Sequence, residues 1–141
     1  MVQRLTVTVK ALPSASLSRL YDQTLRLHFH GASVKGMGRE AYGLYACLMQ
    51  RLRGLRLRVL GVAGELLAER SLGPDALTAV GWQPDEALLP YPRYAFTGYR
   101  HLTEYFLFPQ KFLFCDLRDL RILKDFPTAD RLEALFDMDP L

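Results

Sequence analysis

Three histidines are the first residues in this sequence that could support chemistry. His28 and His30 lie two residues apart on a predicted strand, so their side chains project from the same face, and His101 lies far along the chain. Three histidines can hold a zinc ion. However, His28 and His30 share the polar face of their strand with Thr24 and Arg26, and no cysteine or glutamate accompanies them at ligand spacing. We therefore predict solvated histidines and no metal site.

Other catalytic patterns are missing from the sequence. There is no Gly-x-Ser-x-Gly nucleophile motif, and no Gly-Lys-Ser/Thr follows the glycines within residues 31–38. Cys47 and Cys115 lie among large apolar residues, which predicts buried, unreactive thiols. Glu104 and Asp116 could serve as general acid and base, but nothing in the sequence brings them together. We predict that the protein is not an enzyme and holds no cofactor.

The charge balance is mildly basic. The 141 residues include 18 Lys and Arg and 15 Asp and Glu, which gives a net charge of +3. The densest positive cluster is formed by Arg51, Arg53, Arg56, Arg58 and Arg70. Some of these end a predicted helix, where positive charge suits the helix dipole, and others lie on the outer face of a predicted strand. A small-ligand or nucleic-acid binding module that uses this cluster and exposed tyrosines is the alternative function. No run approaches the roughly 18 apolar residues of a membrane span, and the N-terminus lacks the apolar core of a signal peptide.

Several segments show the alternation of apolar and polar residues that is typical of half-buried strands. They are residues 4–10, 24–30, 55–60 and 65–70, the last two forming a hairpin around a glycine turn. Apolar residues recur at helical spacing over residues 41–52, and Gly54 is placed to end this helix.

The second half of the chain is rich in proline and aromatic residues. Prolines predict irregular, extended backbone over residues 84–94. Residues 98–108 predict a short amphipathic helix. One of its faces carries Tyr99, Leu102, Tyr105 and Phe106, and the other carries Arg100, His101, Thr103 and Glu104. Pro109 limits this helix, and the nearly continuous apolar run at residues 111–117 predicts a strand covered on both faces.

These elements together predict an α+β fold in a single domain spanning residues 1–141. We expect a mainly antiparallel β-sheet or sandwich with one long amphipathic helix and a short second helix. The tail stays open, because it fits either a helix capped by Thr128 or a strand over residues 132–138, and its periodicity does not decide between them.

The aromatic segment at residues 96–114 carries a resemblance to a known family. It reads Phe-Thr-Gly-Tyr-Arg-His-Leu-Thr-Glu-Tyr-Phe-Leu-Phe-Pro-Gln-Lys-Phe-Leu-Phe. This resembles the signature of the TssF family, also called ImpG or VasA, which typically reads Gly-Tyr-Arg-x-Leu-x-Glu-Tyr-Phe-x-Phe-Pro-x-Lys-Phe. Leu88-Leu89-Pro90, Leu25-Arg26-Leu27, Ala41-Tyr42 and Leu44-Tyr45 match as well, so the resemblance covers most of the chain. Family members are considerably longer, which implies an excised internal fragment, and whether Met1 is native stays open.

The resemblance implies a structural component of the type VI secretion system baseplate wedge. The implied partners are a TssG-like wedge protein, TssK, TssE and the spike hub, with self-association within the wedge. The implied location is the cytoplasm, docked at the inner membrane complex through other components. No catalytic residue or cofactor comes with the family, and no nucleic acid or direct membrane insertion is expected.

The family motif is also our candidate interface, and its residues have physical explanations of their own. It comprises Gly98, Tyr99, Arg100, Glu104, Tyr105, Phe106, Phe108, Pro109, Lys111 and Phe112. Gly98 would permit a tight start to the helix, and Arg100 and Glu104, four residues apart, can pair along it. Pro109 would stop the helix, and Lys111 would open the buried strand. Two interpretations of the motif stay open: a local packing solution, or a contact with a partner chain.

Overall fold

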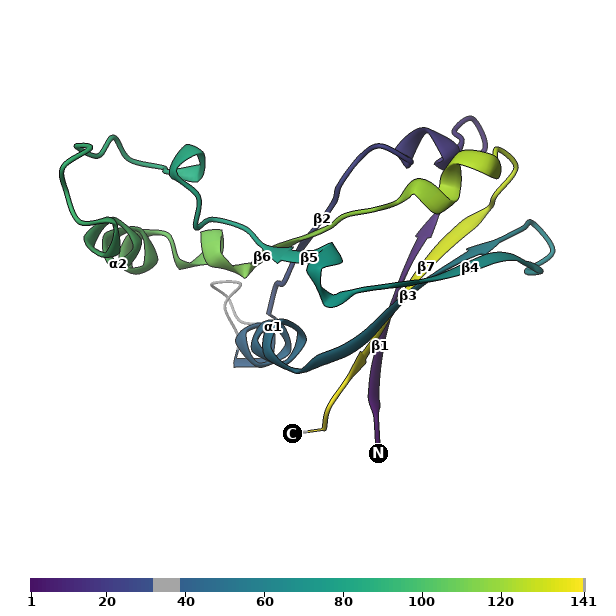
Figure 1. The fold of residues 1–141 in the computed structure, drawn as a ribbon, viewed down its shortest axis with the longest axis horizontal. Helices are drawn as coiled ribbons and strands as arrows, with labels where there is room; N and C mark the ends of the chain where they lie inside the picture. The colour runs from purple at the N-terminus through teal and green to yellow at the C-terminus, as the bar shows by residue number, and fades with distance from the viewer. Residues whose placement is uncertain (32–38, 141) are drawn as a thin grey trace.

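The computed structural model describes residues 1–31 and 39–140, and this part of the chain forms two antiparallel sheets and two α-helices (Figure 1). The larger sheet has the order β1–β7–β3–β4, formed by Gln3–Lys10, Arg131–Met138, Leu52–Leu60 and Leu66–Leu72. The smaller sheet has the order β2–β6–β5, formed by Leu25–His28, Phe114–Leu117 and Leu77–Ala79. The helices are α1 (Arg39–Arg51) and α2 (Thr97–Leu107). The predicted α+β class is confirmed. Gly36 and Gly38, which the sequence analysis considered for a phosphate-binding loop, lie outside the described residues.

The tail of the chain is a strand at the centre of the larger sheet. Phe136 of β7 lies opposite Leu5 of β1 on one side and Leu55 of β3 on the other. Leu132 and Phe136 point into the core and are almost completely buried. The pairing with two neighbours therefore decides between the helix and the strand that periodicity left open.

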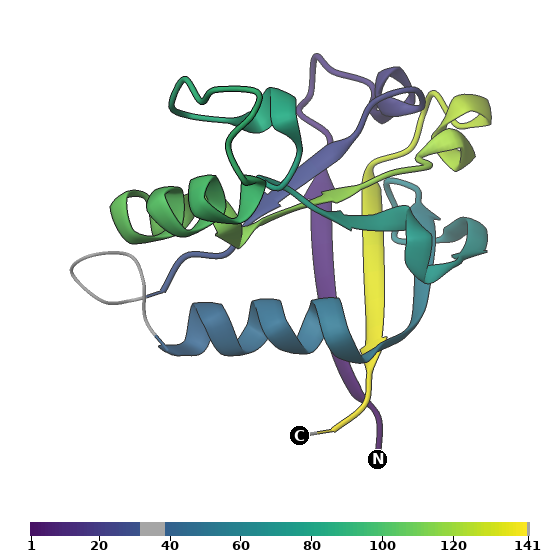
Figure 2. The ribbon, with the colours of Figure 1, turned by 60° about the vertical axis from the view of Figure 1, so that its left-hand side comes forward.

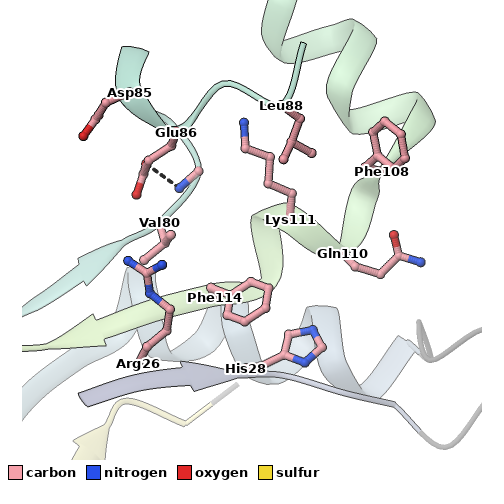
Figure 3. Close-up of a pocket in the computed structure, with 11 residues that line it drawn as sticks. Arg26, His28, Val80, Asp85, Glu86, Leu88, Phe108, Gln110, Lys111 and Phe114 are labelled. Atoms are coloured by element: carbon pink, nitrogen blue, oxygen red, sulfur yellow. Dashed lines mark hydrogen bonds between the residues drawn. The ribbon is translucent and has the colours of Figure 1, made fainter. Parts of the chain in front are cut away.

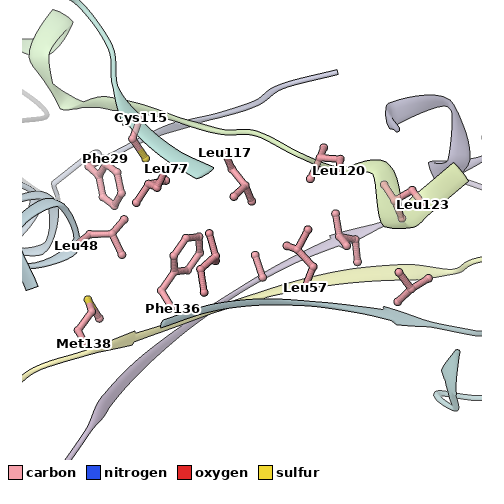
Figure 4. Close-up of a cluster of buried hydrophobic side chains, with 14 of the residues drawn as sticks. Phe29, Leu48, Leu57, Leu77, Cys115, Leu117, Leu120, Leu123, Phe136 and Met138 are labelled. Carbon is pink, nitrogen blue, oxygen red and sulfur yellow. The ribbon is translucent and has the colours of Figure 1, made fainter. Parts of the chain in front are cut away.

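The hydrophobic core lies between the two sheets, and α1 closes one end of it (Figure 4). Leu57 and Phe136 project from the larger sheet toward Cys115 and Leu117 of the smaller one, and Leu48 of α1 fills the space beside them. Each of these side chains is buried. Because alternate residues of a strand point to opposite faces, the period-two pattern in the sequence selects this core.

Two predicted boundaries are wrong. The long helix ends at Arg51, and Gly54 lies within β3, because pairing with β7 takes up the chain from Leu52 onward across an irregular register near Gly54. The predicted strand at residues 111–117 begins only at Phe114. Pro109 opens a short 3-10 helix, η4 (Pro109–Leu113), because its fixed φ suits the first position of a helical turn.

The second helix lies apart from the larger sheet, on the long connection between β5 and β6 (Figures 1 and 2). It packs mainly against η4. The two ends of the chain leave the larger sheet side by side, where Gln3 of β1 pairs with Met138 of β7 (Figure 2). Among the described residues, neither helix has the length and apolar character needed to cross a bilayer.

Candidate functional site

The second helix buries polar residues and exposes aromatic ones. Arg100 and Glu104 are 6% and 0% exposed, whereas Tyr99 and Phe106 are 64% and 79% exposed. A surface helix normally packs through its apolar stripe. Much of the apolar stripe of α2 is instead exposed.

Glu104 is held by an ion pair beneath α2. Its carboxylate pairs with the ammonium of Lys111 and accepts a hydrogen bond from the backbone amide of Leu88 at 2.9 Å. Burial by itself would raise the pKa of the Glu104 carboxyl, but the bonds from Lys111 and Leu88 outweigh it and hold that pKa below its ordinary value. The predicted pairing of Arg100 with Glu104 is therefore wrong. The turn that begins at Pro109 brings Lys111 back under the helix, where its ammonium pairs with Glu104 in place of Arg100. Lys111 therefore lies in η4 and does not open a strand.

Phe112 and Trp82 form the apolar support of the helix. Phe112 is 5% exposed, and its ring centroid lies 4.9 Å from that of Trp82 and 6.1 Å from that of Tyr105. With Tyr42 of α1, these rings line an apolar cleft of about 290 Å³ between the two helices. Sequence reasoning did not single out Trp82. Gly81, which has a φ of 103°, directly precedes Trp82, and this glycine is the sequence feature that could have drawn attention to the position.

Tyr99, Leu102, Tyr105 and Phe106 share one partly exposed side of α2. With the exposed Leu107 and Phe108 at the C-terminal end of the helix, they form the set that we call the aromatic face. Phe96 extends it at the start of the helix, where its ring lies over Gly98 and meets Tyr99 edge-on at 5.6 Å. A Cβ atom at Gly98 would overlap the Phe96 ring. Because the Phe96 ring is exposed, it could move aside for a side chain at this position, and the φ of Gly98 lies outside the left-handed region.

The motif residues thus divide between two roles. Arg100, Glu104, Lys111 and Phe112 point inward and hold α2 on the domain. Tyr99, Tyr105, Phe106 and Phe108 are exposed. Pro109 follows directly on the end of the helix region, as expected of a residue that limits it. Local packing accounts for Glu104, Lys111 and Phe112. It accounts in part for Tyr105, whose ring centroid lies 6.1 Å from that of Phe112, and it leaves Phe106 without a structural explanation.

A hollow of about 580 Å³ lies between the smaller sheet and η4 (Figure 3). Two of the charged groups around it are engaged: Arg26 makes two hydrogen bonds to Asp116, at 2.8 and 2.9 Å, and Glu86 accepts a bond from the Gly81 amide at 2.7 Å. Glu104 and Asp116, which could have formed an acid and base pair, are each bound to a different cation. Glu104 and Asp116 therefore do not converge as a pair for proton transfer.

The three histidines do not come together. His28 stacks on Phe114 with ring centroids 4.2 Å apart, and its ring is 6.1 Å from that of His30. His101 lies on α2 against Trp82. Within residues 1–31 and 39–140, no group of three potential metal ligands is present. Both cysteines are buried, and burial raises the pKa of Cys115 to about 12, which disfavours the reactive thiolate.

The arginine cluster does not form one surface: Arg56 and Arg58 lie on the outer face of β3, Arg51 ends α1, and Arg70 of β4 lies opposite the buried Leu57. Ion pairs occupy most of these arginines. The pairs are Arg53 with Asp139, Arg56 with Glu69 and Asp137, Arg58 with Glu69 and Glu133, and Arg70 with Asp119. Arg51 donates to the carbonyl of Pro140 at 2.7 Å. Because carboxylates are interleaved with the guanidinium groups, the cluster is no concentrated positive patch of the kind that binds phosphate backbones.

Comparisons with known proteins agree with one another. The family model described as "Type VI secretion system, TssF" matches residues 1–140. The chain is similar to type VI secretion system component TssF1 of Pseudomonas aeruginosa PAO1, at 35% identity over 109 residues, which is 77% of this chain and 16% of that protein. Its fold is similar to a chain of the TssK-TssF-TssG baseplate subcomplex solved by cryo-electron microscopy. That match has a TM-score of 0.71 and 20% identity, and it covers 97% of this chain and 24% of the other.

Proposed function

Because the chain belongs to the TssF family of type VI secretion systems, we propose that it is a structural, non-enzymatic part of the baseplate wedge that acts by binding other proteins. The chain spans about a sixth of the curated relative and about a quarter of the similar solved chain, so this role is proposed for the complete protein. We also propose that residues 1–141 form one domain, since one hydrophobic cluster draws side chains from both sheets and from α1.

The observation that carries the proposal is the aromatic face of α2. Phe106 is 79% exposed and Tyr99 is 64% exposed, while the helix is fastened from below by buried charged groups. Contiguous apolar surface of this kind marks contact sites on soluble proteins. Aromatic side chains at such sites carry a large share of binding energy when a partner removes them from water.

The proposed partners follow from the family. A TssG-like wedge protein is the first candidate for the aromatic face, and TssK is the second, since the similar solved structure is a TssK-TssF-TssG subcomplex. TssE, the spike hub and further copies in the wedge are proposed contacts of the complete protein. The proposed location is the cytoplasm, docked at the inner membrane complex through other components, without membrane insertion or nucleic-acid binding.

Co-purification tests this function. The complete protein carrying Phe106→Ala should capture at least several-fold less of its co-expressed TssG-like neighbour than the unmodified protein does. Leu12→Ala is the matched control, because Leu12 is also a large apolar residue, 70% exposed, but lies in the loop after β1. Equal capture by both variants and by the unmodified protein would remove the aromatic face from the proposal. Absence of any capture by the unmodified protein would contradict the proposed wedge role.

A further inference from the structure

Arg100 is a buried cation without a carboxylate partner. Arg100 is only 6% exposed. Among residues 1–31 and 39–140, no Asp or Glu lies within ion-pair distance of its guanidinium. One helical turn away, Glu104 is equally buried but fully paired with Lys111. Taking an unpaired charge out of water is costly, so buried charges in proteins normally have a counter-ion.

The hydrogen bonds of Arg100 are incomplete as well. Its Nη2 donates to the carbonyl oxygens of Trp82 and Gln83 at 3.4 and 3.3 Å, which is long for a guanidinium, and lies 3.0 Å from Nε2 of His101. Its Nε is buried and has no hydrogen-bond partner. A guanidinium held by neutral acceptors and lacking one of its bonds retains the capacity to bind an anion.

The start of α2 adds positive potential at the same place. Arg100 lies in the first turn of the helix, where backbone N–H groups point outward and the helix dipole is positive. Phe96, at the cap position, offers no side-chain acceptor, and the first turn contains no acidic residue. Neither the cap nor the first turn neutralises this end of the helix.

A hollow opens onto these groups. It measures about 530 Å³ and is bounded by the proline-rich loop before α2, with Arg93, Thr97 and Arg100 as its polar wall and no acidic residue in its lining. Leu89 and Tyr91 contribute apolar wall. The hollow therefore combines two arginines and a helix start with apolar surroundings, which strengthens electrostatic attraction.

We propose that this hollow receives the carboxylate of an aspartate or glutamate side chain presented by a protein partner, a proposal that deepens the proposed function of α2 as an interface. Guanidinium and carboxylate match in shape and charge, and a carboxylate would supply the counter-ion that Arg100 lacks. The exposed rings of Tyr94 and Phe96 alternate along the chain with Arg93, Ala95 and Thr97, which line the hollow. This aromatic rim, continuous with the aromatic face, suits a peptide segment in which apolar residues flank the acid.

A titration followed by NMR tests the site in the unmodified chain. The probes are aspartate and glutamate blocked at both backbone ends, with blocked asparagine as the isosteric neutral control and inorganic phosphate as the competing anion. We expect saturable shifts of the Arg100 Nε–H signal and of the Thr97 and Gly98 amides with the acidic probes only. Arg93→Gln should weaken this binding several-fold, whereas Arg19→Gln, at an exposed residue of η1 (Leu17–Leu20), should leave it unchanged. Equal shifts with blocked asparagine, tighter binding of phosphate, or no saturable shift would each overturn the proposal.

This outcome is separable from that of the proposed function. If Phe106→Ala reduces capture of the TssG-like neighbour but the acidic probes cause no shift, the carboxylate site is wrong and the aromatic interface stands. If the probes bind but Phe106→Ala leaves capture unchanged, the carboxylate site stands and the aromatic face loses its support. Because the titration uses the unmodified chain, it gives an answer even if substitution of the buried Arg100 prevents folding.

Discussion

The carboxylate of Glu104 and the ammonium of Lys111 meet beneath α2, with Glu104 completely buried and the Lys111 side chain 9% exposed. The two residues are seven apart, and the short turn that opens at Pro109 closes the distance between them. This pair joins the helix to the chain that leads into the smaller sheet, and it fixes which side of α2 turns inward. The exposure of the aromatic face follows from it.

Breaking this pair should be strongly destabilising. Glu104→Gln leaves the buried ammonium of Lys111 without a counter-ion, and Lys111→Met does the same to the carboxylate of Glu104. Either change should lower the free energy of unfolding by about 3–5 kcal/mol. Urea denaturation would measure the loss for each variant. The double variant should lose less than the sum of the two, because neither charge is then left alone. Arg121→Gln serves as the control, since it removes an exposed ion pair with Asp119 and should change stability little. Additive losses would show that the two residues do not stabilise the helix as a pair.

Stability should fall in mild acid for the same reason. The pKa of Glu104 is lowered in the folded chain from an ordinary value of 4.5, so the ion pair contributes its full stability above that value. This contribution is lost as the pH falls from about 4.5 through the lower folded pKa. Urea midpoints measured between neutral pH and about pH 3 would check this. Glu104→Gln should show a shallower decline than the unmodified chain, and parallel curves would contradict the role of Glu104.

Buried and exposed aromatic residues of the motif should differ in how much they stabilise the fold. Phe112→Ala removes a ring that is 5% exposed and should cost about 3–5 kcal/mol. Phe106→Ala removes a ring that is 79% exposed and should stay within about 0.5 kcal/mol of the unmodified chain. Thermal unfolding followed by circular dichroism would compare them. A large loss from Phe106→Ala would mean that this ring packs within the domain and is not free for a partner.

Cys115 should resist alkylation in the folded chain. Its side chain has no exposed surface, and burial raises its pKa to about 12, so the thiolate is scarce near neutral pH. Mass spectrometry after iodoacetamide treatment should find Cys115 modified only as fast as the fold opens. In denaturant both cysteines should react quickly, which is the control. Rapid modification of Cys115 in native buffer would show that the core between the sheets opens readily.

Sequence reasoning was strongest where one face of an element is buried against the same chain. Alternation at Leu5, Val7 and Val9 predicted β1, and the apolar spacing around Leu48 predicted α1, because core and solvent impose a period on those residues. The same reasoning grouped the residues of α2 by face. It could not tell which face is inward, since that depends on Lys111 reaching Glu104 across a turn.

Boundaries and pairings were weaker for related reasons. A glycine after an apolar helical pattern is typical of a helix end, but pairing with β7 places Gly54 in a strand. Arg100 was assigned as the partner of Glu104 because the two residues are four apart on one helix. The nearly continuous apolar run at residues 111–117 predicted a strand and gave no sign of the helical turn that begins at Pro109. The hollow at Arg100 could not be predicted either, because its walls come from a proline-rich loop whose path no periodicity specifies.

The pairing of Gln3 with Met138 has a mechanical consequence. A stretching load between the two chain ends would draw antiparallel neighbours apart sideways, so it would act on one rung of the ladder at a time, from this pair toward Lys10 and Arg131. Resistance in shear, in which all residue pairs share the load, would require the load to act at opposite ends of the paired strands. A load applied between Gln3 and Met138 would therefore separate β1 from β7 one residue pair at a time.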